Sequence, residues 1–354
     1  MVTENRPRWP ARVLEWLRRL RAWLLASLGL RSGKWRRGRT TLDVARFVAP
    51  LRTSRTWRYG LYVPGGLRDD EAAPLIVLLH GCRQRALGFG EASGWVAHAN
   101  RARVRLLCPE QRRLSNLLRC WNWFDPRAQS GMGDAQVVLA MIDEIARSMH
   151  VDGNSIAVVG LSAGGALAAL LGFRHPERFR AVATVAAPPL LGSFSLQSAR
   201  FVMLHGLARD PALALGAATS ACTPMLIIHG RDDRVVNPRC AEQLLAQAAE
   251  SYRRARIETE RVERADPADS ATVTEFRAGG SPVLRRIDIA GLGHVWTGGS
   301  DGHPYCERKG PGLTAMCAQF LNDVGFAAPG NAANDKADGP PVAQGNAEFG
   351  ISGG

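Results

Sequence analysis

The sequence predicts an α/β fold, in which a mainly parallel twisted sheet carries helices on both faces and a lid-like insertion. Three observations support this prediction. Short apolar runs alternate with helical patterns through the middle of the chain, a glycine-flanked serine follows one of these runs, and the 354 residues are 46% hydrophobic. A chain of this length and composition can bury a substantial core, and one large domain of about 280 residues is expected.

The strand and helix signals come in the order that a parallel sheet requires. Apolar runs cover residues 75–79, 104–107, 156–159, 181–186 and 225–228, and helical patterns such as residues 133–149 and 163–173 lie between them. Buried parallel strands have this near-continuous apolar character, and the helices cover the two faces of their sheet. Residues 188–223 separate the last two runs without a clear strand. We interpret this segment as a lid, with a plain crossover helix and loops as the alternative.

The sequence Gly160-Leu161-Ser162-Ala163-Gly164 lies between the third apolar run and an alanine-rich helical stretch. A nucleophile elbow needs this context: a strand that stops abruptly, a serine on a strained turn, and a helix whose N-terminus points at the reacting oxygen. Glycines two positions before and after the serine leave room for the crowded backbone. The pattern therefore predicts Ser162 as a nucleophile, with a tight turn that carries an incidental serine as the alternative.

An acid and a base are expected later in the chain, in the order serine, acid, histidine. The run at residues 225–228 leads into a loop with Asp232 and Asp233, on the sheet edge where open α/β sheets bind ligands. The spacing His-Gly-x-x-Asp-x-x-Val favours Asp233 as the acid, while Asp232 caps the turn or faces solvent; two simple turn-forming acids are the alternative. His294 follows an alternating stretch at residues 284–289, which predicts an edge-side strand. We predict His294 as the base.

Two backbone N–H groups are needed to bind a developing oxyanion. Ala163 supplies one, directly after the nucleophile. Cys82 supplies the other, in a His-Gly turn that follows the first apolar run. No metal or organic cofactor is required by such a site, and no Cys or His pairing in the sequence has zinc-ligand spacing.

Five motifs in this order resemble the poly(3-hydroxybutyrate) depolymerase family of esterases. They are Leu-His-Gly-Cys-Arg-Gln at residues 79–84, Cys-Trp-Asn-Trp-Phe at 120–124, Gly-Leu-Ser-Ala-Gly-Gly at 160–165, the loop at 229–236, and Gly-His-Val-Trp-Thr-Gly-Gly at 293–299. The resemblance covers roughly residues 46–325. It implies an α/β-hydrolase fold and a serine esterase that cleaves 3-hydroxybutyrate oligomers or polymer, or related short-chain esters, through an acyl-serine intermediate, with Ser162, Asp233 and His294 as its triad.

The chain departs from the family pattern at Arg83 and Thr297. A large cation beside the oxyanion turn is expected to alter substrate preference. Trp123 and Trp296 are predicted to bind substrate, because a pocket for neutral esters should be apolar, and a place in the core is the alternative for both rings. The expected partner is therefore a small-molecule or polymeric ester.

Two other functions stay open. A carbohydrate esterase of the feruloyl or acetyl-xylan type shares the same chemistry and differs only in its pocket contacts. A non-catalytic protein that binds a granule or membrane surface on a hydrolase scaffold is the alternative from another class. The intact spacing of the three triad residues argues against this last interpretation.

The segments at residues 1–45 and 327–354 differ from the catalytic domain, which we place at residues 46–326. In the first segment, leucines recur at helical spacing among arginines, with Trp16 and Trp23 beside them. Such a basic amphipathic helix can lie on an anionic membrane or a polymer granule, with a disordered or packed extension as the alternative. The last segment is rich in Gly, Ala, Asn, Asp and Pro, which predicts a disordered tail.

The net charge of +13 does not by itself predict a nucleic-acid partner, because the excess arginine is spread over arm and domain and no recognition motif appears. Seven cysteines leave at least one thiol free. The pairs Cys82–Cys120 and Cys306–Cys317 are hypotheses, and either would favour an oxidising compartment. The family implies secretion, whereas arginines interrupt any export signal, so extracellular and cytoplasmic locations both stay open, as does the oligomeric state.

Overall fold

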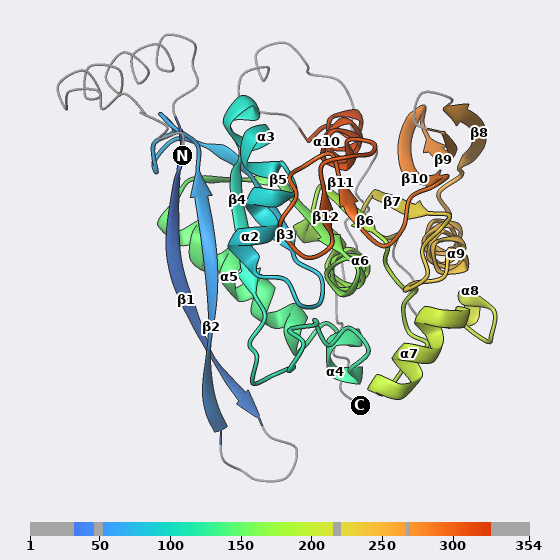
Figure 1. The fold of residues 1–354 in the computed structure, drawn as a ribbon, viewed down its shortest axis with the longest axis horizontal. Coiled ribbons are helices and arrows are strands. Elements are labelled where there is room, and N and C mark those ends of the chain that lie inside the picture. Colours follow the sequence, from blue (N-terminus) through green and yellow to red (C-terminus); the bar gives the residue numbers. More distant parts are fainter. Residues whose placement is uncertain (1–31, 46–51, 215–220, 267–269, 327–354) are drawn as a thin grey trace, which may run out of the picture.

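The computed structural model describes residues 32–45, 52–214, 221–266 and 270–326. These residues form a ten-stranded twisted sheet with helices on both faces, and a small second sheet of two strands (Figure 1). The strands are β1 Lys34–Ala45, β2 Arg52–Val63, β3 Ala73–Leu79, β4 Arg105–Glu110, β5 Val151–Leu161, β6 Ala181–Val185, β7 Met225–Gly230, β8 Glu260–Asp266, β9 Ala271–Ala278, β10 Ser281–Ile289, β11 Trp296–Thr297 and β12 Cys306–Glu307. The helices are α2 Ala86–Ala92, α3 Trp95–Ala102, α4 Pro126–Gln129, α5 Asp134–Ser148, α6 Ala163–Arg174, η1 Pro176–Arg178, α7 Leu196–His205, α8 Pro211–Ala214, α9 Arg239–Arg254 and α10 Leu313–Asp323.

The strand order in the large sheet is β1-β2-β4-β3-β5-β6-β7-β10-β9-β8. The six central strands, in the order β4-β3-β5-β6-β7-β10, pair parallel. Antiparallel strands flank them on both sides. This arrangement confirms the predicted α/β fold with a mainly parallel sheet. The five apolar runs lie in β3 to β7, and the two helical patterns coincide with α5 and α6.

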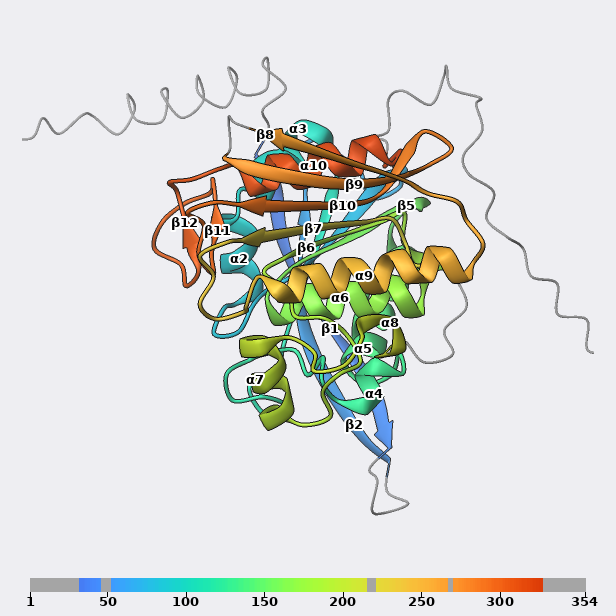
Figure 2. The same cartoon turned by 90° about the vertical axis from the view of Figure 1, so that its right-hand side faces the viewer.

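The central strands separate two hydrophobic cores. In β3, Leu75, Val77 and Leu79 face one core while Ile76 and Leu78 face the other, and all five are fully buried. Helices α5, α6 and α9 cover the first face, and α2, α3 and α10 cover the second (Figure 2). A strand that is buried on both faces reads as a continuous apolar run, which explains why the sequence predicts β3 to β7 so directly.

The hairpin of β1 and β2 corrects the predicted boundary between arm and domain. Residues 34–45, assigned to the arm, form edge strand β1, which pairs with β2 from Lys34 opposite Val63 to Ala45 opposite Arg52. An edge strand needs little apolar content, so the arginine-rich sequence of β1 carries no strong strand signal. The predicted helix between residues 11 and 30 and the predicted tail at 327–354 lie outside the described residues.

The described part of the predicted lid, between β6 and β7, contains helices α7 and α8 and no strand. Helix α7 is attached to the loop after β7, because the Asn237 N–H donates to the Met203 carbonyl at 2.7 Å. Phe194, Leu196 and Phe201 on and beside α7 are exposed. The segment therefore presents an apolar surface next to the loop that carries the predicted acid, and its movement as a lid stays a prediction. Among the described residues, no helix is long and apolar enough to cross a bilayer.

One of the two cysteine hypotheses agrees with the structure. A disulfide joins Cys82 to Cys120, whose Cα atoms are 4.3 Å apart, and it links the loop after β3 to the segment after β4. The other hypothesis is wrong, because Cys306 and Cys317 are separate free thiols buried in the core. Burial raises the pKa of the Cys306 thiol to about 11, and the Gln84 side-chain amide donates to its sulfur. These two thiols fill the core instead of clamping a loop.

Candidate active site

Ser162 lies on the turn between β5 and α6, with a backbone φ of 56° and ψ of −120°. A positive φ is strained for a residue that has a Cβ, and the Ser162 N–H is fixed by the Val185 carbonyl at 2.8 Å. The serine occupies the N-cap position of α6, yet its side chain makes no capping hydrogen bond. Serine at this position normally caps the helix with its hydroxyl. The Ser162 hydroxyl is therefore not used to cap the helix and is available for the predicted nucleophilic role.

Two glycines make this turn possible. A Cβ at Gly160 would lie 2.2 Å from the Gly164 carbonyl oxygen, and a Cβ at Gly164 would lie 2.2 Å from the Leu79 carbonyl oxygen. Both obstacles are backbone atoms, which cannot rotate away as the end of a side chain can. The glycine spacing thus relieves the crowded serine and also lets the start of α6 press against the end of β3.

Strand register brings the three predicted triad residues to one edge of the sheet. Strands β5, β6, β7 and β10 lie next to one another and pair parallel up to their C-terminal ends. Ser162 follows β5 directly, Asp233 lies three residues after β7, and His294 lies five residues after β10. The C-terminal edge of parallel strands is where open α/β sheets bind ligands.

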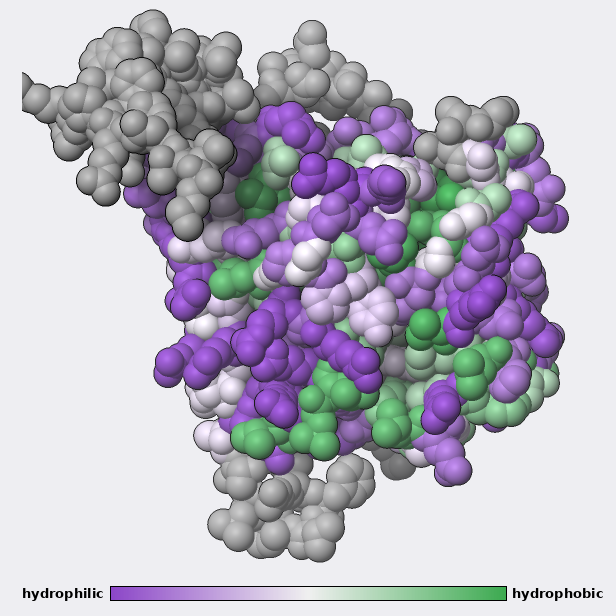
Figure 3. Space-filling view, in the orientation of Figure 1, coloured by the Kyte–Doolittle hydropathy of each residue, from purple (hydrophilic) through white to green (hydrophobic). Residues whose placement is uncertain are grey.

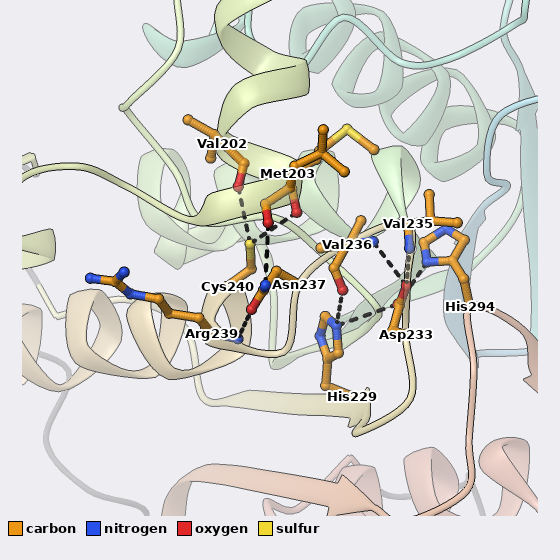
Figure 4. A network of polar contacts seen from close by, with 11 residues as sticks. Val202, Met203, His229, Asp233, Val235, Val236, Asn237, Arg239, Cys240 and His294 are labelled. Atoms are coloured by element: carbon orange, nitrogen blue, oxygen red, sulfur yellow. Dashed lines mark hydrogen bonds and ion pairs between the residues drawn. The ribbon is translucent and has the colours of Figure 1, made fainter.

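Asp233 is buried and bonded on both carboxylate oxygens (Figure 4). Its Oδ1 accepts hydrogen bonds from the N–H groups of Val235 and Val236, each at 2.8 Å, and its Oδ2 lies 2.8 Å from His294 Nδ1. Burial tends to raise the pKa of Asp233, but the hydrogen bonds from His229 and His294 outweigh burial and hold that pKa well below its usual range. An ionised carboxylate only accepts, so His294 Nδ1 carries the proton and Nε2 is the basic nitrogen of the neutral ring.

A second imidazole, that of His229, contacts the same carboxylate. Its Nε2 lies 2.9 Å from the Val236 carbonyl oxygen, so the ring bonds the backbone of the loop. The same nitrogen lies 3.4 Å from Asp233 Oδ2, a contact that sequence reasoning missed. The only signal for it is the position of His229 at the end of β7, four residues before Asp233. Asp232, in contrast, is exposed.

The predicted base is hydrogen-bonded to the acid. Among the described residues, no hydrogen bond joins Ser162 Oγ to His294 Nε2. The His294 ring packs edge to face against Tyr305, with centroids 5.7 Å apart, and 7% of the His294 side chain is exposed. Hydrogen bonds of this kind are often long in unliganded proteins and tighten when substrate binds.

The predicted oxyanion donors lie on two segments that touch each other. The backbone N–H groups of Cys82 and Ala163 donate to no acceptor in the described part of the chain. Gln84 fixes the turn that carries Cys82, because its side chain accepts from the Gly81 N–H at 2.7 Å and donates to the Pro304 carbonyl at 2.6 Å. Both predicted donors are therefore free to bind a ligand oxygen.

The two predicted substrate-binding tryptophans lie in the core instead. Trp296 has no exposed surface, its Nε1 donates to the Ser93 carbonyl at 3.1 Å, and its ring packs edge to face on Phe89. Trp123 is 3% exposed and packs on Phe124. The structure contradicts the predicted role of both rings, because large aromatic side chains gain most from complete burial. In the described residues, no group of three or more His, Cys, Asp or Glu side chains is placed to hold a metal ion.

The sheet order and the placement of a strained serine at its C-terminal edge make this protein an α/β hydrolase. Among solved structures, it is similar to acetyl xylan esterase from Aspergillus awamori, with a TM-score of 0.60 and 17% identity, over 77% of this chain and 94% of that one. Residues 57–265 match the family described as Esterase PHB depolymerase. The chain belongs to this family, as the five motifs in its sequence predict.

Two curated relatives extend the comparison. The chain is 30% identical over 277 residues to poly(3-hydroxyalkanoate) depolymerase C of Paucimonas lemoignei, a match that covers 74% of this chain and 62% of that protein. It is 27% identical over 248 residues to feruloyl esterase B of Neurospora crassa, which covers 66% of this chain and 82% of that protein. The chain thus spans less than two thirds of the length of the depolymerase.

Proposed function

We propose that the protein is a serine esterase that hydrolyses 3-hydroxybutyrate oligomers or polymer, or related short-chain esters, through an acyl-serine intermediate. The observation that carries this proposal is the hydrogen bond between Asp233 and His294 on the sheet edge that also holds the Ser162 elbow. A nucleophile, a base and an orienting acid in these positions are what acyl transfer from an ester to water needs.

The residues divide the reaction between them. His294 Nε2 takes the proton of Ser162 as its Oγ attacks the ester carbonyl, and Asp233 orients the ring and stabilises the imidazolium. The N–H groups of Cys82 and Ala163 bind the oxyanion, and each such donor contributes about 3 kcal/mol to the stability of the transition state. The imidazolium then gives its proton to the departing alcohol. Water repeats the cycle on the acyl-serine and releases the acid.

His229 supports this arrangement as a positioning residue. Its ring is fully buried, 3.4 Å from Asp233 Oδ2, and it helps to keep that carboxylate ionised beneath the base. An ionised Asp233 cannot donate a hydrogen bond, so the proton stays on His294 Nδ1 and Nε2 stays basic. The Ser162 proton then has a defined destination.

The substrate class rests on the relatives. The match to a poly(3-hydroxyalkanoate) depolymerase supports hydroxyalkanoate esters, and the match to a feruloyl esterase supports a carbohydrate ester as the second candidate. The two candidates share every catalytic step and differ only in what lies beyond the scissile bond. A panel of 3-hydroxybutyrate oligomers, p-nitrophenyl acyl esters of graded length and feruloyl esters separates them.

We expect turnover of the 3-hydroxybutyrate oligomers and the short p-nitrophenyl esters, and loss of both in Ser162→Ala. Activity confined to feruloyl esters would replace the leading proposal by the second one. A fluorophosphonate probe should label the natural chain and not Ser162→Ala. Absence of labelling in the natural chain would favour the non-catalytic surface-binding alternative.

The N-terminal segment carries a separate proposal, contact with a membrane or a polymer granule. Its predicted helix lies outside the described residues, whereas β1 belongs to the sheet. The matched comparison is therefore the full chain against a chain that starts at Ser32 and keeps β1. Full-length protein should pellet with anionic vesicles or granules more than the shortened chain, and equal pelleting would remove the idea.

A further inference from the structure

A cleft of about 1140 Å³ lies beside the oxyanion turn, between the β1–β2 hairpin, the start of α2 and the segment after β4. Eight arginines and one carboxylate, that of Glu110, line it. Hydrophilic side chains gather over this part of the molecule in the space-filling view (Figure 3). Glu110 is itself paired with Arg119 at 3.6 Å and accepts from the Ala86 N–H, so it does not neutralise the rest of the cleft.

Six of the eight arginines in this cleft are exposed and form no ion pair within the described part of the chain. They are Arg37, Arg39, Arg58, Arg83, Arg85 and Arg113. Among the described residues, no carboxylate lies within 4.0 Å of any of these six guanidinium groups. Their neighbour on β1, Arg36, instead pairs with Asp69 at 2.7 Å.

Two of these arginines are held directly opposite each other. Arg39 on β1 is the cross-strand partner of Arg58 on β2, and Arg37 lies on the same face two residues earlier. Like charges in directly opposite positions destabilise a strand pair. A cleft lined by one sign of charge also concentrates the field and attracts ions of the opposite sign. A ligand with negative charges removes the repulsion that the fold leaves in place.

Two residues that line the cleft, Arg83 and Pro304, are next in the chain to residues of the candidate active site. Arg83 directly follows Cys82, whose N–H is a proposed oxyanion donor. Pro304 lines the cleft and accepts the hydrogen bond from Gln84 that fixes the same turn. The next residue, Tyr305, packs against the ring of His294. A chain that lies in the cleft is therefore led toward the oxyanion donors and the base.

We propose that this cleft binds an extended chain of repeated carboxylates, an acidic polysaccharide, and that the esters cleaved at Ser162 include substituents of that chain. Arginine presents a planar fork of donors that matches a carboxylate in two parallel hydrogen bonds. Six arginines that have no carboxylate partner in the described part of the chain exceed what the single terminal carboxylate of a hydroxyalkanoate oligomer needs. The volume slightly exceeds the usual range of a site for one small ligand.

The lining disfavours two other anionic partners. Single-stranded nucleic acid needs exposed aromatic rings on which its bases stack. Among these described lining residues, Tyr59 is the one Phe, Tyr or Trp side chain, and it is only 8% exposed. A membrane surface is contacted by a flat or convex basic face, whereas this site is hollow. The cleavage of esters on the polysaccharide rests on the proposed esterase activity. The binding of the polysaccharide in the cleft does not.

The binding test uses polygalacturonate, with neutral xylan and a single-stranded DNA oligomer as comparison ligands. In titration calorimetry at low ionic strength, the natural chain should bind polygalacturonate at least about tenfold more tightly than xylan, with an affinity that falls as salt is added. Arg39→Glu/Arg85→Glu reverses one charge on each wall and should reduce that affinity about tenfold or more. The control variant Arg101→Glu/Arg147→Glu changes the net charge by the same amount at the ends of α3 and α5, outside the cleft. It should change the affinity for polygalacturonate less than about twofold.

The catalytic test compares acetate release from acetylated polygalacturonate and acetylated xylan. The ratio of the two kcat/KM values should fall about tenfold in Arg39→Glu/Arg85→Glu and stay unchanged in Arg101→Glu/Arg147→Glu. Equal binding of polygalacturonate by the cleft variant and the natural chain would overturn the inference while the esterase proposal stands. Tighter binding of DNA than of polygalacturonate would also overturn it. Failure to hydrolyse any acetyl ester, p-nitrophenyl acetate included, would overturn the esterase proposal and with it the catalytic part of this inference.

Discussion

Charged groups are arranged in opposite ways in two neighbouring regions. One is the sheet edge that carries Asp233 and His294, and the other is the arginine cleft. Around Asp233, the carboxylate is buried and each of its oxygens has a partner 2.8 Å away. In the cleft, six guanidinium groups are exposed and have no carboxylate among the described residues. A buried charge without partners strongly destabilises the fold, whereas an exposed arginine is solvated by water and stays available to bind a ligand. The difference supports the proposals that one region performs the reaction and that the other selects the substrate.

The largest expected effect comes from the acid. Asp233→Asn should lower kcat/KM for every ester substrate by about 10⁴-fold, because an amide does not keep the proton on His294 Nδ1. The matched control is Asp232→Asn, at an exposed neighbouring position, which should leave kcat/KM within about twofold of the natural value. Equal losses in the two variants would mean that the acid is assigned to the wrong residue.

The disulfide at the border of the two regions comes next. Cys82 and Cys120 are bonded, and five cysteines are free. Denaturation without reductant should therefore expose five reactive thiols, and Cys82→Ser/Cys120→Ser should lower the free energy of unfolding by about 2–4 kcal/mol. A count of seven thiols, with no loss of stability on substitution, would contradict this linkage between the oxyanion turn and the segment after β4.

The contact between elbow and oxyanion turn predicts a loss of similar or smaller size. In Gly164→Ala, the new Cβ would lie 2.2 Å from the Leu79 carbonyl oxygen, so backbone must shift at a cost of about 1–3 kcal/mol in the free energy of unfolding. Gly153→Ala is the control, since nothing lies within 4 Å of its Cβ position. Urea unfolding of the two variants measures the difference, and equal midpoints would show that the elbow and β3 are not packed as described.

The smallest expected effect is a pH dependence of stability. The folded protein holds the pKa of Asp233 below its ordinary value of about 3.9, so Asp233 stabilises the fold above that pH. The contribution is lost as pH falls from that value through the lower pKa of the folded state. The stability difference between the natural chain and Asp233→Asn should therefore shrink between pH 7 and pH 3 in urea unfolding. A constant difference in stability over this range would contradict an ionised Asp233 carboxylate with hydrogen bonds to both of its oxygens.

The two regions also differ in how well sequence reveals them. Ser162 and Asp233 follow apolar runs that are visible in the sequence, and His294 follows an alternating stretch, so the sequence places all three residues after predicted strands. The cleft is built from β1, β2, the start of α2 and two loops. Edge strand β1 is rich in arginine and has no apolar period, and the apolar period of β2 reveals only the face that packs on the core. Of the arginines that line the cleft, only Arg83 is identified from the sequence, as a departure from the family pattern.

Other misses have the same physical origin. Trp123 and Trp296 are near the predicted site in sequence, but the direction of each ring depends on core packing that no local pattern encodes. The burial of Cys306 and Cys317 as two separate thiols likewise depends on distances across the fold. Local motifs therefore predict the reacting groups, while tertiary contacts decide what surrounds them.

The most direct test of the division between reaction and selection compares two variants on two substrates. Asp233→Asn should lower kcat/KM for acetylated polygalacturonate and for acetylated xylan by the same factor, because both esters use the same acid. Arg39→Glu/Arg85→Glu should lower kcat/KM for acetylated polygalacturonate about tenfold more than for acetylated xylan. Equal losses on both substrates in the arginine variant would contradict the account.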